Sequence, residues 1–238
     1  MGEGTFRIGV GVLRCGTHYS NGNPVLESDN SGTPARPAAA RVIQNHLTPG
    51  RRHRRNAPYN SVMPTARLFY ALWPDPPMAQ TLSTWAALAQ PHSHGRPMRT
   101  ETLHMTLAFL GQVEREIADE LIDATAYHRL QPGSVTLDRY GVFDRPRILW
   151  AGPAQTPDGL QASHDGLWLW LSAFGFAPPA QPFRPHVTLL RNIERHDPPA
   201  SAPPPLTWRY DRMVLVASES TDGGSRYRVV ARSRPQPG

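Results

Sequence analysis

Two copies of a short pattern, His-x-Thr-Leu, place groups suited to acid–base chemistry at separate points of the chain. The first copy spans His104 to Leu107 and the second spans His186 to Leu189, 82 positions later. Apolar residues surround each copy, as in a half-buried β-strand, whose alternate side chains lie on opposite faces. The imidazole of each copy therefore shares a face with its threonine hydroxyl. Two such strands lying side by side would bring two imidazoles and two hydroxyls into one cleft.

The repetition matters because a single His-x-Thr triplet is common. A third triplet, His46 to Thr48, is followed at once by Pro49 and Gly50. Proline followed by glycine is typical of a turn rather than of a continuing strand, so this copy is set aside. One copy alone would most simply be a core histidine bonded to its neighbouring threonine. Two copies within apolar runs favour a shared functional site.

Two imidazoles that face one cavity favour in-line displacement at a phosphodiester. The ordinary pKa of histidine is near 6.5, so one ring can accept a proton from the attacking oxygen while the other gives one to the leaving oxygen. Each transfer typically contributes about 10²- to 10⁴-fold. The hydroxyls of Thr106 and Thr188 can donate to phosphate oxygens. No metal is needed, and neither motif has a carboxylate or second histidine at ligand spacing.

The elements that must position the two motifs begin at about residue 66 and indicate an α+β fold. Strands are predicted over residues 67–73, 103–110, 135–143, 147–151, 185–191, 207–218 and 226–232, and helices over 78–89, 114–129 and 158–174. Strands and helices alternate around each motif, with antiparallel hairpins between strands. We therefore expect two pseudo-symmetric lobes around a central groove, with antiparallel sheets, and motif strands that face each other across a pseudo-twofold axis.

Four other histidines of this region are given no catalytic role. His92 and His94 are predicted to lie in a surface loop of Pro, Ser and Gly. His128 is predicted near the end of a helix, where a histidine complements the helix dipole. His164 lies on the best-defined predicted helix and is assigned no role.

Residues 1–65 are predicted to be a disordered, basic and proline-rich extension, and residues 66–234 the working domain. The first 66 residues carry eight Arg against three acidic residues, whereas the rest carry seventeen against sixteen. The extension has too little apolar periodicity to offset its ordering entropy. An alternative is that Met63 is the natural start. The positive charge of the whole chain is therefore not an argument for RNA binding by the working domain.

The single cysteine, Cys15, excludes an internal disulfide and a cysteine-based metal cluster. No apolar run reaches transmembrane length, and the N-terminus lacks the pattern of a signal peptide. These observations lead us to expect a soluble cytoplasmic protein, monomeric and without a membrane partner.

The residues around both motifs resemble the paired His-x-Thr motifs of the 2H phosphoesterase superfamily. The most similar branch is that of the RNA 2',3'-cyclic phosphodiesterases, also called 2'-5' RNA ligases. The resemblance covers about residues 66–232 and rests on residues 67–71, 103–111, 183–191 and 216–218, with Gly224, Tyr227 and Val229. It implies a two-lobed fold with helices on the outside, in which the motif strands line a central groove.

The resemblance also implies an activity: hydrolysis of an RNA 2',3'-cyclic phosphate to a 2'-phosphomonoester, with the reverse ligation as a further capacity. No metal or nucleotide cofactor is implied. His104 would be the proton donor and His186 the proton acceptor, with Thr106 and Thr188 on the phosphate; spacing alone leaves donor and acceptor interchangeable. Arg191 closes the second motif, but strict alternation puts it on the face opposite His186, so a phosphate role requires the strand to end or twist there.

Two other functions remain open at this point. Small cyclic phosphates, such as a cyclic nucleotide, would require the same chemistry between different groove walls. An RNA-binding module would keep the groove without doing chemistry, although binding alone needs neither a general acid nor a general base. The expected partners are therefore RNA ends or nucleotides that carry a 2',3'-cyclic phosphate.

Overall fold

The computed structural model describes residues 65–199, 204–221 and 224–235. The predicted extension over residues 1–65 lies outside this part, apart from Thr65, which opens the first strand. The elements in chain order are β1 (Thr65–Leu72), α1 (Pro76–Ser93), β2 (Arg96–Pro97), the 3₁₀ turn η1 (Thr100–Thr102), β3 (Met105–Glu114), α2 (Arg115–Thr125), β4 (Gly133–Leu137), β5 (Arg139–Phe143), β6 (Ile148–Gly152), α3 (Asp158–Leu171), the 3₁₀ turn η2 (Ser172–Phe174), β7 (Val187–Arg191), β8 (Leu206–Tyr210), β9 (Val214–Thr221) and β10 (Gly224–Arg232).

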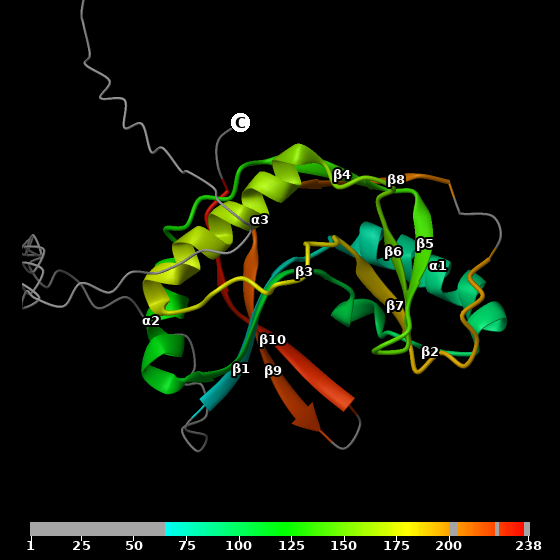
Figure 1. The fold of residues 1–238 in the computed structure, drawn as a ribbon, viewed down its shortest axis with the longest axis horizontal. Coiled ribbons are helices and arrows are strands. Elements are labelled where there is room, and N and C mark those ends of the chain that lie inside the picture. The colour runs from blue at the N-terminus through cyan, green and yellow to red at the C-terminus, as the bar shows by residue number, and fades with distance from the viewer. Residues whose placement is uncertain (1–64, 200–203, 222–223, 236–238) are drawn as a thin grey trace, which may run out of the picture. The chain divides into compact units, whose positions relative to one another are not determined.

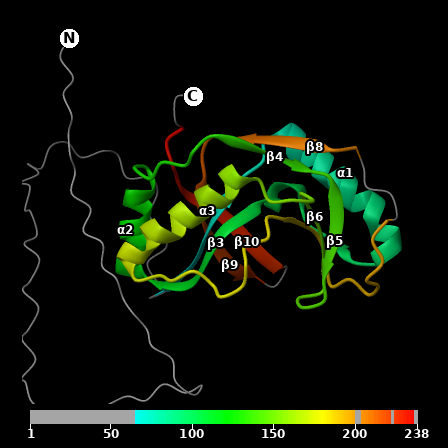
Figure 2. The same cartoon turned by 45° about the horizontal axis from the view of Figure 1, so that its top comes forward.

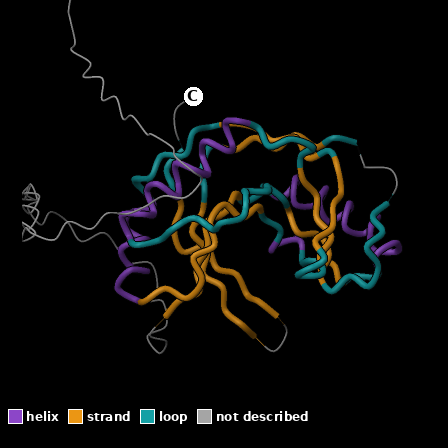
Figure 3. Tube along the Cα trace, viewed as in Figure 1, coloured by secondary structure: helices purple, strands orange, loops and turns teal. Residues whose placement is uncertain are grey.

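Antiparallel sheets with helices packed outside them confirm the predicted α+β class. The larger sheet has the order β10-β9-β1-β3-β7-β6-β5, with β2 paired to β7, and β4 pairs with β8 in a second sheet. Helix α1 packs against β7, α2 against β1 and β10, and α3 against β3 and β4 (Figures 1 and 2). Figure 3 shows the strands diverging into two groups from the centre of the domain. The motif strands β3 and β7 join these two groups as direct neighbours.

Helix α1 extends further at both ends than its predicted span of 78–89. The Asp75 carboxylate accepts a hydrogen bond from the Met78 backbone N–H at 2.9 Å and caps the N-terminus. At the other end Pro91 removes a single hydrogen bond, and the helix continues for two more residues. The predicted loop position of His92 is therefore wrong, since it lies in the last turn. His94 ends the helix in the left-handed region, with a φ of 55°.

The first motif strand was predicted to end before Gly111, but β3 continues through this residue. Gly111 lies within β3 with a φ of +72°, in the region that favours glycine. The pairing of β1 with β3 shifts register beside it, between Leu68 and Phe69. Such a shift is a β-bulge, which a glycine in this conformation commonly forms. The strand therefore bends at Gly111 and continues to Glu114.

Two predicted strands, 135–143 and 207–218, are each divided in two. The first breaks at Asp138 because β4 pairs with β8 whereas β5 pairs with β6. The Asp138 carboxylate accepts a hydrogen bond from the Ala154 backbone N–H at 2.7 Å at this break. The second breaks before β9, which pairs with β1 and β10 instead of β4. The apolar alternation of each segment is interrupted at its break, by Asp138 and Arg139 in the first and by Asp211 and Arg212 in the second.

His128 lies beyond the end of α2, which stops at Thr125, so the predicted helix over 114–129 is too long. Its ring packs against Trp170 with the ring centroids 4.8 Å apart, and burial lowers its pKa. The predicted interaction with a helix dipole is replaced by this packing. Thr125 instead makes a buried 2.8 Å hydrogen bond between its hydroxyl and that of Tyr70.

The helix predicted over 158–174 is confirmed as α3 with its 3₁₀ extension, and Gly175 follows in the left-handed region at a φ of +84°. His164 of this helix is buried, and its Nε2 accepts a 3.1 Å hydrogen bond from the Trp168 indole. Its ring stacks on Phe183 at a centroid distance of 4.0 Å. This contact ties the segment before β7 to α3. In the described ranges no helix is long and apolar enough to cross a membrane.

Candidate active site

The two motif strands lie side by side at the centre of the larger sheet. Strands β3 and β7 are antiparallel, and Met105 pairs with Val187. Both of these side chains are fully buried, and alternation turns their sequence neighbours to the opposite face of the sheet. That face carries the four polar residues of the motifs, all half-buried, namely His104, Thr106, His186 and Thr188. The structure thus brings these four predicted site residues together.

Each motif contains a β-bulge at its leucine. The pairing of β1 with β3 skips Leu107, and the pairing of β6 with β7 skips Leu189. A skipped residue shifts the rest of its strand by one position relative to the faces of the sheet. Two positions after each bulge, Phe109 and Arg191 therefore return to the side of the sheet that carries the histidines. The two motifs share this irregularity as well as their sequence pattern.

Both imidazoles are held in the same way. Nδ1 of His104 lies 2.6 Å from the carbonyl oxygen of Thr102, and Nδ1 of His186 lies 2.7 Å from that of Arg184. A carbonyl oxygen only accepts, so Nδ1 carries the hydrogen and donates it in both rings. Nε2 is then the nitrogen left for chemistry. When the ring is neutral, Nε2 can accept a proton, and when the ring is charged, Nε2 can donate one.

Aromatic rings enclose His104. The indole of Trp73 stacks on it at 5.5 Å with an angle of 6° between the planes. Phe69 lies 4.8 Å away, and Tyr227 presents an edge-on contact at 5.3 Å. Phe69 belongs to β1, Trp73 follows that strand and Tyr227 belongs to β10. The surroundings of His104 are therefore supplied by strands on the β1 side of β3.

Burial lowers the pKa of both histidines. The pKa of His104 falls to about 4, mainly through desolvation of the charged ring; the hydrogen bond to Thr102 opposes this shift, and the charges of Arg191 and His186 add to it. The pKa of His186 is also lowered by burial, with the carbonyl of Arg184 opposing and the Arg191 charge adding. Each ring is therefore mainly neutral at pH 7, and Arg191 acts electrostatically on both.

His186 has a different aromatic wall. The ring of Phe143 lies 5.0 Å away in an edge-on contact, and Trp150 lies 6.1 Å away. A Cβ on Gly141, across the strand, would fall 2.1 Å from the Trp150 ring, so only glycine allows the indole to lie there. The Arg139 guanidinium covers this indole at 5.7 Å. The indole N–H of Trp150 is buried and has no hydrogen-bond partner within the described residues.

Arg191 lies on the histidine side of the sheet, which corrects the position that strict alternation predicted. The bulge at Leu189 supplies the required change of face. The side chain is half-buried, and its Nε donates to the Met98 sulfur at 3.3 Å. This bond orients the guanidinium while leaving its terminal N–H groups for an anion.

The hydroxyls of Thr106 and Thr188 make no side-chain hydrogen bond to another described residue. They are half-buried donors beside the two imidazoles. No group of three or more His, Cys, Asp or Glu side chains in the described part of the chain could hold a metal ion. The imidazoles, the two hydroxyls and the Arg191 guanidinium are groups suited to binding an anion and moving protons.

The sequence-based prediction assigned no role at the site to the aromatic residues that surround the two histidines, namely Phe69, Trp73, Phe143, Trp150 and Tyr227. Phe69 shares one face of β1 with Arg67 and Ala71, and Trp73 continues this alternation just past the end of the strand, which was a usable signal. Arg96, which pairs with Arg191, had no such signal because its strand β2 has only two residues.

Comparison with known proteins places this chain and its fold among the LigT-like phosphoesterases. A family model described as LigT like Phosphoesterase matches residues 72–150. The RNA 2',3'-cyclic phosphodiesterase of Escherichia coli (strain K12) is 34% identical over 170 residues, which cover 70% of this chain and 94% of that protein. Its counterpart in Thermus thermophilus is 31% identical over 179 residues, which cover 70% of this chain and 88% of that protein. The chain belongs to the RNA 2',3'-cyclic phosphodiesterase family.

Solved structures agree with this assignment. E. coli LigT complexed with 3'-AMP superimposes with a TM-score of 0.61 at 31% identity, covering 71% of this chain and 97% of that one. The same protein has been solved with NADP+ and with phosphate. A protein of known structure from Thermus thermophilus superimposes with a TM-score of 0.56 at 26% identity and covers 70% of this chain and 96% of that chain. The predicted family, fold class and enzyme class are confirmed.

Proposed function

We propose that this enzyme hydrolyses the 2',3'-cyclic phosphate of an RNA end to a 2'-phosphomonoester without a metal. The main support is the matched pair of imidazoles of His104 and His186. Their strands are neighbours, and each Nδ1 is bonded to a carbonyl oxygen, so that each Nε2 is left for proton transfer. Relatives more than 30% identical are RNA 2',3'-cyclic phosphodiesterases, and E. coli LigT has been solved with phosphate and with 3'-AMP.

The proposed reaction is a single in-line displacement. Nε2 of His186 accepts a proton from water as the water oxygen bonds to phosphorus. The bond between phosphorus and the 3'-oxygen breaks, and His104 donates its Nε2 proton to that oxygen. The products are a 2'-phosphomonoester and a free 3'-hydroxyl. Thr106 and Thr188 donate hydrogen bonds to the non-bridging oxygens, and Arg191 stabilises their negative charge.

The lowered pKa values determine when the donor becomes protonated. At pH 7 both rings of the free enzyme are mainly neutral, because the pKa of His104 is about 4 and that of His186 is also lowered. The reaction needs one charged ring. A bound phosphate anion favours the charged form and offsets the Arg191 charge that lowers both pKa values. We therefore expect substrate binding to take up a proton, so that KM rises as the pH rises above about 7.

The decisive experiment compares His104→Ala and His186→Ala with His92→Ala on a nucleoside 2',3'-cyclic phosphate. His92 is exposed in the last turn of α1 and serves as the matched control. We expect each motif variant to lose at least about 10³-fold in kcat, and the control to retain wild-type activity. Circular dichroism verifies folding, and ³¹P NMR identifies the phosphomonoester.

Three outcomes would contradict specific parts of the proposal. Normal turnover by either motif variant would remove that histidine from the mechanism. A 3'-phosphomonoester product would reverse which bond is broken. Loss of activity after dialysis against EDTA, restored by a divalent ion, would replace the metal-independent mechanism.

A further inference from the structure

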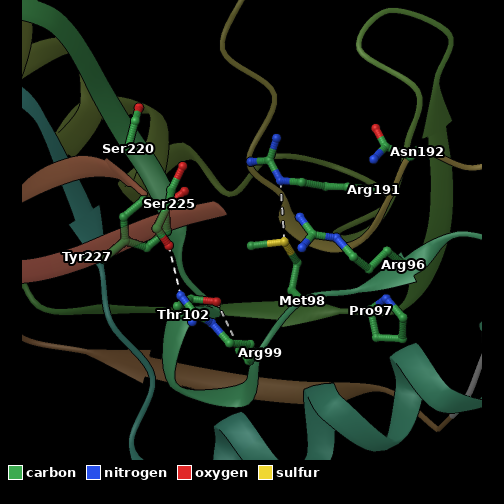
Figure 4. Close-up of a pocket in the computed structure, with 10 residues that line it drawn as sticks. All are labelled: Arg96, Pro97, Met98, Arg99, Thr102, Arg191, Asn192, Ser220, Ser225 and Tyr227. Atoms are coloured by element: carbon green, nitrogen blue, oxygen red, sulfur yellow. Dashed lines mark hydrogen bonds between the residues drawn. The ribbon is translucent and has the colours of Figure 1, made fainter. Parts of the chain in front are cut away.

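A cavity of about 350 Å³ opens beside the two motif histidines. Its lining residues include Arg96, Met98, Arg99, Arg191, Ser225 and Tyr227. Figure 4 shows Arg96 and Arg191 extending toward Met98 from one wall, with Ser225 and Tyr227 on the other. Tyr227 also contacts the His104 ring at 5.3 Å, and Arg191 acts on both histidines. The cavity therefore adjoins the reacting groups through two shared residues.

Two of the arginines that line the cavity, Arg96 and Arg191, lie close enough for their like charges to repel each other. Arg96 and Arg191 are direct partners across the β2–β7 ladder, so their side chains leave the same face of the sheet. Like charges at directly opposite positions destabilise a sheet. Neither residue takes part in an ion pair with any residue in the described part of the chain. A bound anion between the two guanidinium groups would turn this repulsion into attraction.

The third arginine that lines the same cavity, Arg99, is held in position by a hydrogen bond. An Nη of Arg99 donates to the carbonyl oxygen of Ser225 at 2.8 Å, which links η1 to β10. Its Nε lies 3.5 Å from Glu101 in a largely exposed ion pair, which solvent weakens. Together with Arg96 and Arg191 it gives the cavity three guanidinium groups. Guanidinium matches the oxygens of a phosphate with paired hydrogen bonds.

We propose that this cavity binds the phosphate on the 5' side of the ribose that carries the cyclic phosphate. The inference rests on the proposed function and names its substrate class. A 2',3'-cyclic phosphate occupies both the 2'- and 3'-oxygens, so any further phosphate of the substrate is attached through the 5'-oxygen. The preferred substrate is then a nucleotide with two phosphate groups. The second is either the backbone phosphodiester of an RNA or a 5'-phosphomonoester.

The test measures kcat/KM for three substrates with the same base: a nucleoside 2',3'-cyclic phosphate, the same compound with a 5'-phosphate, and a dinucleotide that ends in the same cyclic phosphate. The wild-type protein is expected to prefer the second or third substrate over the first by about tenfold. Preference for the dinucleotide identifies an RNA backbone phosphate, and preference for the 5'-monophosphate identifies a terminal phosphate.

Arg96→Gln and Arg99→Gln are expected to reduce this preference by about three- to tenfold each, because each removes one charged donor to the second phosphate. Arg129→Gln is the charge-matched control, since Arg129 is exposed after α2 and does not line the cavity. Thermal melting verifies folding, and Arg99→Lys, which keeps the charge, should retain part of the preference if Arg99→Gln is destabilised.

Two results would overturn the proposal. Equal kcat/KM values for the three substrates in the wild-type protein would exclude a second phosphate subsite. A wild-type preference that survives both glutamine substitutions would place that subsite elsewhere. Absence of turnover with all three substrates would instead contradict the proposed function, so the two failures are distinguishable.

Discussion

The half of the molecule that carries His104 and the half that carries His186 repeat one local design in different surroundings. In each half, Nδ1 of the histidine donates to a carbonyl oxygen two residues earlier. In each half, the leucine of the motif forms a β-bulge. These shared features depend only on neighbouring residues and the adjacent strand. They explain how two distant segments present the same nitrogen of the ring for chemistry.

The surroundings differ at the position two residues beyond each bulge. In the first half this position is Phe109, which is 52% exposed and lies under the Arg67 guanidinium at 5.1 Å. In the second half it is Arg191, whose charge lowers the pKa of both histidines. The same backbone irregularity therefore presents an aromatic surface in one half and a cation in the other. We infer that the shared motif fixes how each imidazole is oriented. The residue two positions beyond the bulge, Phe109 or Arg191, then makes the surroundings of the two histidines different.

The largest expected effect tests this division between the two histidines. His104→Ala and His186→Ala should each retain traces of activity, whose pH dependence identifies the missing group. Loss of the proton donor removes the fall in rate at high pH, because that fall reports deprotonation of the donor. Loss of the acceptor removes the fall at low pH. We expect the first behaviour for His104→Ala and the second for His186→Ala, and the opposite result would exchange the roles.

Replacing the cation should have a smaller effect on rate but a distinct effect on pH dependence. Arg191→Met is expected to lower kcat/KM by about 10- to 100-fold, because a charged hydrogen-bond donor to the phosphate is lost. It should also move the pH profile of kcat/KM upward, because the Arg191 charge lowers both histidine pKa values. Phe109→Met, at the matched position, is the control and should leave the profile in place. An unchanged profile in Arg191→Met would contradict the electrostatic role.

The smallest expected effect is on stability, and it concerns the half that carries His104. The pKa of His104 is lowered from 6.5 to about 4, so between these values the unfolded chain binds a proton that the folded chain does not. The free energy of unfolding should therefore decrease as the pH falls from about 6.5 to about 4. His104→Gln should flatten this dependence in urea unfolding curves measured at several pH values. An unchanged slope would show that burial does not disfavour the charged ring.

The sequence was sufficient for features that depend on local order. The doubled His-x-Thr-Leu pattern and strand alternation predicted that His104 and Thr106 share a face, and likewise His186 and Thr188. Helix α3 was predictable because apolar residues recur along it at helical spacing and Gly175 follows its 3₁₀ extension. The family resemblance depended on these same residues and is confirmed by the relatives.

Other features were decided only by tertiary structure. The breaks at Asp138 and before β9, the bulge that turns Arg191 toward the histidines, and the pairing of Arg96 with Arg191 all depend on which strand lies alongside. Hydrogen bonding between strands joins residues distant in the chain, and a bulge exists only relative to a partner strand. The types and spacing of the reacting groups could therefore be predicted from the sequence. The electrostatic surroundings that lower the histidine pKa values, and the arginine-lined cavity beside them, became apparent only from the tertiary structure, which brings the strands together.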